Sequence, residues 1–139
     1  MPHRHKSKFE FLDHTADIKI KAYGKDMEEL FENLALAVTT YMSKGKKILS
    51  SKKKIIKIKA QDSDALLYKF IDEILFLVDA KNFVISKTKL KIKDNQLTAE
   101  FLGDDVKNYH LDHVKAPTYA EMYIKKTPSG FEAQLVLDV

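Results

Sequence analysis

The segment from residue 62 to residue 80 limits the possible folds more than any other part of the chain. Apolar side chains recur there at helical spacing, and extra leucines widen the apolar face until it nearly encircles the helix. They are Leu66, Leu67, Phe70, Ile71, Ile74, Leu75, Leu77 and Val78. Charged residues interrupt the run and make it too polar to cross a bilayer; among them, Asp72 and Glu73 are interpreted as a solvated edge rather than a catalytic pair. We therefore predict a central buried helix, opened by the capping oxygens of residues 62–64.

A second helix is predicted after Gly24, where Asp26 and Glu29 have the spacing of a capping box. Its apolar residues share one side: Met27, Leu30, Phe31, Leu34, Val38 and Tyr41. Strand-like alternation begins at residue 9 and returns at residues 18–23, 52–60, 84–93, 96–102, 117–126 and 131–139. Turns at residues 94–95 and 128–130 join the last four segments into two hairpins. The predicted class is α+β, a single domain with two main helices packed on a mixed or antiparallel β-sheet.

A chain of 139 residues, 45% of them hydrophobic, has the size and composition of one globular domain. We place that domain at residues 9–139, after a flexible basic tail of residues 1–8. The sequence contains no cysteine, which excludes disulfides, thiolate metal sites and a cysteine nucleophile. No apolar signal core follows the tail, so we expect a cytoplasmic protein. Lysines crowd residues 44–59, where a solvated strand face is the simpler interpretation and nucleic-acid contact the alternative.

Chemistry is concentrated where the first strand breaks. Asp13, His14 and Asp17 fall within five positions, just before the alternation resumes. Carboxylates on short stems suit a hard cation that takes oxygen ligands, whereas a polar turn would use the same residue types to satisfy its own backbone. At the other end of the sequence, Asp138 stands beside the terminal carboxylate of Val139. A bound cation, a lysine partner or solvation would each relieve the repulsion between these two anions.

Lys115 and Glu121 are possible neighbours of this acidic set. His110 and His113 are three residues apart and could form a transition-metal site on a helical turn, but a connecting loop with exposed histidines is the preferred interpretation. The sequence lacks the glycine-rich nucleotide loops, the nucleophile elbow of hydrolases and the HExxH zinc motif. Three classes remain open: a cation-binding protein, a metal-dependent phosphohydrolase or nucleotidyl-transfer enzyme that uses Asp13 and Asp17, and an RNA-binding module.

Four blocks of the sequence resemble the archease family, small proteins that assist the RtcB-type tRNA-splicing RNA ligase. The blocks are residues 9–17 with the core Leu-Asp-His-Thr-Ala-Asp, Gly24 with residues 27–32, residues 114–119, and the pair Asp138-Val139. They keep the order of the family along nearly the whole chain. The resemblance implies an accessory protein, not an enzyme, that promotes guanylylation and multiple turnover of the ligase in tRNA splicing. It implies association with tRNA through the ligase and none with a membrane.

The resemblance also implies a divalent cation, which is calcium in the family, with magnesium or manganese as alternatives. Carried over position by position, its ligands are Asp17, Asp138 and Val139. Asp13 and His14 match the same motif and are expected near the ion or at the ligase contact. Lys115 matches a shared basic position, for which we expect a contact with the ligase or its nucleotide.

Overall fold

The computed structural model describes residues 7–12 and 17–139 of the chain. Its elements follow one another in the order β1 (Phe9–Leu12), β2 (Ile18–Gly24), α1 (Met27–Ser43), β3 (Lys52–Lys59), α2 (Ser63–Lys81), β4 (Phe83–Lys93), β5 (Gln96–Asp105), the short 3-10 helix η1 (Val106–Asn108), β6 (Ala116–Thr127) and β7 (Gly130–Asp138). Among the described residues, no helix is long and apolar enough to span a membrane.

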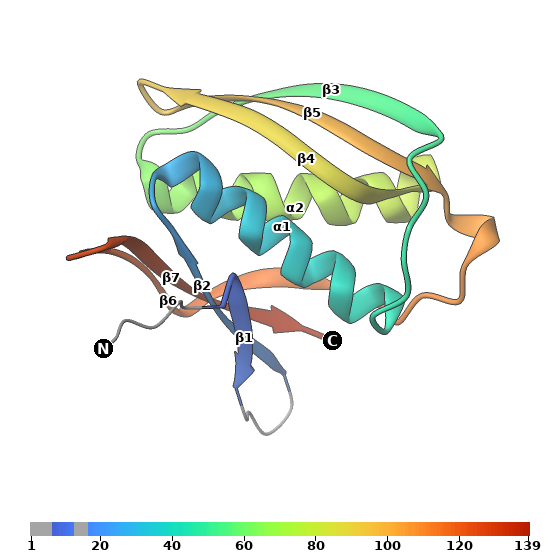
Figure 1. The fold of residues 1–139 in the computed structure, drawn as a ribbon, viewed down its shortest axis with the longest axis horizontal. Coiled ribbons are helices and arrows are strands. Elements are labelled where there is room, and N and C mark those ends of the chain that lie inside the picture. Colours follow the sequence, from blue (N-terminus) through green and yellow to red (C-terminus); the bar gives the residue numbers. More distant parts are fainter. Residues whose placement is uncertain (1–6, 13–16) are drawn as a thin grey trace.

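The strands of the described chain form two antiparallel sheets. Sheet A has the order β1-β2-β7-β6, and sheet B has the order β3-β5-β4. Both helices lie between the sheets, as Figure 1 shows. α1 packs on β2 and β4, and α2 packs on β6 and β4. The α+β class with two main helices on antiparallel strands is confirmed. The strands form two sheets rather than one because both helices have apolar side chains to bury on either side.

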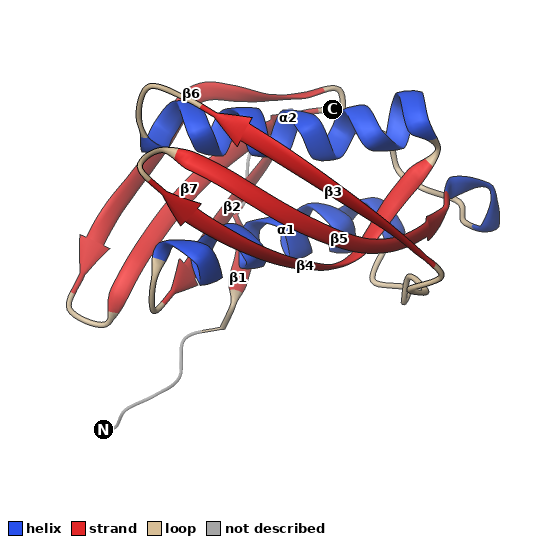
Figure 2. Cartoon of the chain, turned by 90° about the horizontal axis from the view of Figure 1, so that it is seen from above, coloured by secondary structure: helices blue, strands red, loops and turns tan. Residues whose placement is uncertain are grey.

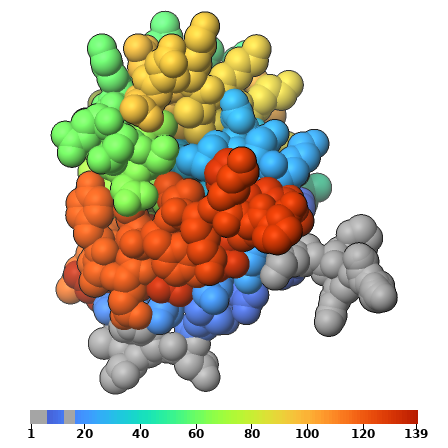
Figure 3. All heavy atoms as spheres, turned by 90° about the vertical axis from the view of Figure 1, so that its left-hand side faces the viewer, coloured from blue at the N-terminus to red at the C-terminus, as the bar shows by residue number. Residues whose placement is uncertain are grey.

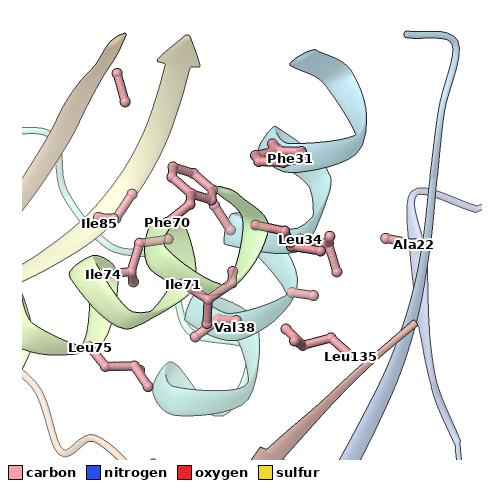
Figure 4. Close-up of a cluster of buried hydrophobic side chains, with 14 of the residues drawn as sticks. Ala22, Phe31, Leu34, Val38, Phe70, Ile71, Ile74, Leu75, Ile85 and Leu135 are labelled. Carbon is pink, nitrogen blue, oxygen red and sulfur yellow. The ribbon is translucent and has the colours of Figure 1, made fainter. Parts of the chain in front are cut away.

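α2 provides the centre of the core. Figure 4 shows its residues Phe70, Ile71 and Ile74 between α1 and the strands. All three side chains are fully buried, and they join a cluster that also contains Leu34 of α1, Ile85 of β4 and Leu135 of β7. The prediction of a central buried helix is therefore confirmed. Of the apolar residues predicted for the two helices, Met27, Tyr41 and Val78 lie at the edge of this core and are only partly buried.

The start of α1 follows the predicted capping box. The carboxylate of Asp26 accepts the Glu29 N–H at 2.8 Å, which satisfies one of the free donors of the first turn. The Glu29 carboxylate accepts the N–H of Lys25 at 2.8 Å, one residue before the cap. Gly24 precedes this turn, and a Cβ at its position would meet the Leu30 backbone nitrogen at 2.4 Å. Glycine is required there because α1 approaches the end of β2 so closely.

Two further glutamates of α1 cover the open edge of sheet B. β4 is an edge strand, so some of its N–H groups have no strand partner. The Glu32 carboxylate accepts the N–H of Leu90 at 3.3 Å, and the Glu28 carboxylate accepts the N–H of Ile92 at 3.2 Å. Burial raises the pKa of Glu32, an effect that the hydrogen bond from Leu90 partly offsets. The block of residues 27–32 therefore caps a helix and closes a sheet edge at the same time.

The predicted hairpin β4–β5 is present, with Asp94 and Asn95 in its turn, but β5 extends beyond the predicted end at residue 102. β5 continues to Asp105, because Gly103 and Asp104 still pair with β4. The side chain of Asp104 is buried and accepts hydrogen bonds from Ser51, Tyr109 and Asn108. This buried aspartate ties the start of β3 to the loop that follows η1.

Candidate functional site at the end of sheet A

Three predicted site residues lie at one end of sheet A, where Asp138 ends β7 and where Asp17 and Lys115 directly precede β2 and β6. Ile18 at the start of β2 faces Leu137 near the end of β7, so Asp17 and Asp138 occupy the next positions on adjacent strands. Asp138 pairs with the first residue of β6, and its carbonyl oxygen accepts the Lys115 N–H at 2.8 Å. The structure thus brings Asp17, Lys115 and Asp138 together from the two ends of the sequence. Asp13 and His14 lie outside the described residues.

Alternation along the strands decides which face these side chains occupy. Leu135 and Leu137 are buried in the core between the sheets, so Val136 and Asp138 belong to the outer face of sheet A. Lys19 faces Val136 and shares that outer face. Asp17 is half-buried, whereas Asp138 and Val139 are exposed. The carboxylate pair therefore lies at the rim of the outer face, where a solvent ion could reach it.

Glu121 was predicted as a neighbour, and the structure places it on the same outer face. Its carboxylate Oε1 lies 2.7 Å from Lys19 Nζ. The residue has a φ of 58° and sits in a bulge of β6 between Thr118 and Tyr123. Its carbonyl oxygen accepts a hydrogen bond from Gln134 Nε2 at 2.8 Å, which holds the bulge over β7. Glu121 thus pairs with a lysine that lies two residues along β2 from Asp17, on the same face of the sheet.

The bulge also explains why both faces of β7 are buried. Glu132, Gln134 and Val136 alternate with the core residues, as predicted, but they are 9%, 8% and 1% exposed. Tyr123 donates its hydroxyl hydrogen to the Glu132 carboxylate. That bond, with Lys125 at 3.6 Å and Lys21 at 4.0 Å, holds the pKa of Glu132 below its ordinary value. Burial, together with the same bond, raises the pKa of Tyr123 to about 12.

The oxygen donors at this end of sheet A suit a hard divalent cation. Calcium takes six to eight oxygen ligands from carboxylates, backbone carbonyls and water. Asp17 and Asp138 supply two carboxylates, and the main chain at Val139 is adjacent. No group of three or more His, Asp or Glu side chains that could hold a metal occurs within residues 7–12 and 17–139. Any ion here would therefore rely on the carboxylate pair, main-chain oxygens and water for its described ligands.

The histidines at positions 110 and 113 lie in the loop between η1 and β6 and not on a helical turn. His113 Nε2 lies 3.8 Å from Asp79 Oδ1, and both side chains are at least half exposed. The carbonyl of His110 accepts a hydrogen bond from Lys44 at 3.2 Å. The preferred interpretation, a connecting loop with exposed histidines, is confirmed for this segment.

Comparison with known proteins gives a consistent result. The model of the Archease protein family (MTH1598/TM1083) matches residues 9–139. The chain is 37% identical over 139 residues to a protein archease of Methanosarcina barkeri, which covers 94% of this chain and 95% of the relative. It is 36% identical over 137 residues to a protein archease of Methanothermobacter thermautotrophicus, with coverage of 94% and 98%.

Two solved structures share the fold. The solution structure of Methanobacterium thermoautotrophicum protein 1598 matches with a TM-score of 0.78 and 35% identity, over 95% of this chain and 99% of that one. The crystal structure of a Thermotoga maritima archease, described as a possible chaperone, matches with a TM-score of 0.70 over the full length of both chains. Its identity is 18%, so this second likeness concerns the fold alone.

Proposed function

Because the chain belongs to the archease family, we propose that it is an accessory protein that activates an RtcB-type RNA ligase. In this proposal it promotes guanylylation and multiple turnover of the ligase during tRNA splicing in the cytoplasm, and it meets tRNA through the ligase. The observation that carries the proposal is the meeting of Asp17 with Asp138 at one end of sheet A. Both positions also match the family's blocks at the two ends of the sequence.

We propose that Asp17, Asp138 and the main chain at Val139 hold a divalent cation, calcium by resemblance. A bound dication would neutralise the two carboxylates and keep ligand positions open to oxygens of a partner. The strand pairing supplies the preorganisation, because Ile18 and Leu137 are fixed opposite each other next to the two aspartates. In this proposal the register brings the two aspartate positions side by side, and a dication bound there would neutralise both carboxylates.

Lys115 is the group best placed to contact the ligase. The preceding residue, Val114, is buried in the core. The backbone N–H of Lys115 donates a hydrogen bond to the Asp138 carbonyl. Its backbone is thus fixed beside the carboxylate pair, while its side chain is exposed. A lysine ammonium is a compact charge that pairs with carboxylates and phosphates. We propose that it contacts an acidic group of the ligase or a phosphate of its nucleotide.

The test is guanylylation of the ligase with and without this protein, in separate series with calcium, magnesium and manganese. We expect faster guanylylation and more than one ligation per ligase molecule when the protein is present. Asp138→Ala should lose the stimulation. Asp94→Asn is the matched control, because Asp94 lies in the β4–β5 turn and its positive φ suits asparagine.

The same experiment separates the enzyme alternative from the accessory role. A metal-dependent phosphohydrolase or nucleotidyl-transfer enzyme would turn over nucleotide substrates without the ligase. Incubation of the isolated protein with nucleoside triphosphates and each ion should yield no product above background. Turnover that disappears in Asp17→Asn would contradict the accessory role and favour the enzyme.

A further inference from the structure

The outer face of sheet B carries a regular array of lysines. The register places Lys53, Lys57 and Lys59 on β3 and Lys87, Lys89, Lys91 and Lys93 on β4, in two rows on either side of β5. All seven are exposed, and together they form what we call the lysine face. Figure 2 views the molecule from this side, with the three strands in front of both helices. In Figure 3, side chains of the β4 segment stand out at the top of the molecule.

Charge is strongly segregated on this face. Seven of the 24 lysine and arginine residues of the chain lie there, with Glu100 as the one outward acidic residue between them. The face thus has a net charge of +6, whereas the whole chain has +4, and the rest of the protein is net negative. Glu100 Oε2 lies 3.2 Å from Lys53 Nζ, which still leaves six lysines in excess. A concentration of one sign on one sheet face produces a positive field that attracts polyanions.

Edge protection does not explain the array. Lysines on edge strands often prevent pairing with other chains, and β3 and β4 are both edges. However, Glu28 and Glu32 of α1 already occupy N–H groups at the open edge of β4. The four lysines of β4 stand on the sheet face instead, in register with Gln96, Thr98, Glu100 and Leu102 of β5. Protection of that edge therefore does not require four lysines, and it does not explain why all four lie on the same face of the sheet.

We propose that the lysine face binds the phosphate backbone of a nucleic acid without reading its bases. Lysines two apart on a strand are about 6.6 Å from each other, and the two rows lie about 9.6 Å apart across β5. Such an array offers several ammonium groups to successive phosphates, which is the sequence-independent part of nucleic-acid binding. The outward residues of β5 between the rows are Gln96, Thr98, Glu100 and Leu102, and Ile55 stands within the β3 row. None is aromatic, so the face lacks the stacking surface with which sheets bind bases.

The five lysines of β3 therefore divide into two groups. Lys53, Lys57 and Lys59 belong to the lysine face, whereas Lys52 pairs with Asp105 at 3.5 Å and Lys54 lies over the Phe83 ring. The four lysines of β4 come from a different part of the sequence and double the array. This contact would be direct, unlike the contact through the ligase in the proposed function, and it does not depend on that function.

The experiment measures binding of the isolated protein to a labelled mixed-sequence RNA oligonucleotide by fluorescence anisotropy, across a series of potassium chloride concentrations. The test variant is Lys57→Gln with Lys91→Gln, since these two residues come from the two rows and flank Thr98 of β5 from opposite sides. Loss of two phosphate contacts should lower the slope of log K against log salt by about 1.4 for a single strand. A second RNA of different sequence should lose affinity by the same factor.

The matched control is Lys8→Gln with Lys126→Gln, which removes the same charge from exposed lysines beside β1 and on β6, at sheet A. The control should keep the wild-type slope, and both double variants should keep the wild-type melting temperature because all four side chains are exposed. Equal slopes for the test variant and the wild type would overturn the proposal. An equal loss of RNA affinity in the test variant and the control variant would also overturn it. Absence of salt-dependent RNA binding, with capture of polyglutamate or phosphatidylserine vesicles instead, would also overturn it.

Discussion

Ile18 of β2 lies opposite Leu137 of β7, and this pairing sets Asp17 beside Asp138 at one end of sheet A. Asp17 directly precedes β2 and Asp138 ends β7, 121 positions later in the sequence, so they meet only in the folded chain. A ligand that binds both must stabilise the fold, because it has no equivalent site in the unfolded chain. If the proposed ion binds there, its binding would be coupled to folding through this pair of strands.

Replacement of Ile74 by alanine should lower the free energy of unfolding by about 2–5 kcal/mol. Ile74 is fully buried between α1 and sheet B, so the change removes contacts and leaves a cavity. Urea unfolding of the two proteins measures the difference. Phe76→Ala on the same helix is the control: its side chain is 48% exposed, and the loss should be clearly smaller. An Ile74→Ala loss below about 0.5 kcal/mol would mean that the core is wrongly assigned.

Replacement of Gly24 by alanine should destabilise the protein by about 2 kcal/mol or more, since the new methyl group meets the backbone of α1. The clash is with main-chain atoms of residues 29 and 30, which cannot rotate away as a side chain can. Thermal unfolding followed by circular dichroism measures the effect. An unchanged melting temperature would show that α1 does not approach β2 as closely as the structure has it.

The buried Asp104 should make the fold sensitive to acid. The hydroxyls of Ser51 and Tyr109 and the Asp105 N–H donate hydrogen bonds that hold the pKa of Asp104 well below its ordinary value of 3.8. The unfolded chain therefore binds the proton more readily than the folded one. The stabilisation is complete above about pH 4 and is lost as the pH falls from there toward the lowered pKa of the folded protein.

Asp104→Asn removes the ionisation, so the free energy of unfolding of this variant should fall less steeply than that of the wild type as the pH is lowered below 3.8. Urea melts at several pH values give both curves. Ser51→Ala should show an intermediate dependence, because its hydroxyl has the largest effect on the pKa of Asp104. Parallel curves for wild type and Asp104→Asn would contradict this account.

The features that sequence reasoning found were the local ones. The two helices, their caps at Asp26 and Asp62 and the turn at residues 94–95 depend on residues a few positions apart. The division into two sheets was not predicted, because it depends on which distant strands pair. β2 pairs with β7 and β3 pairs with β5. The alternation of apolar and polar residues shows which face of a strand is buried, but not which strand pairs with it.

The same limit applies to the candidate site and the lysine face. Alternation predicted a strand at residues 131–139, but it did not indicate that the bulge at Glu121 covers one of its faces and that Glu132 and Gln134 are buried. Glutamate has no preference for a positive φ, so the sequence contained no signal for the bulge. The lysines of β3 are evident in the sequence, whereas their alignment with those of β4 depends on β5, which lies between the two strands.

The most direct test of the account is calorimetric titration with calcium of the wild type, Asp17→Asn, Asp138→Asn and the double variant. Each single variant should bind at least about tenfold more weakly, which is about 1.4 kcal/mol. The double variant should lose less than the sum of the two single losses, because both carboxylates serve one ion. Asp94→Asn should bind like the wild type. If Asp138→Asn binds calcium with wild-type affinity, Asp17 and Asp138 do not share an ion and the central claim is contradicted.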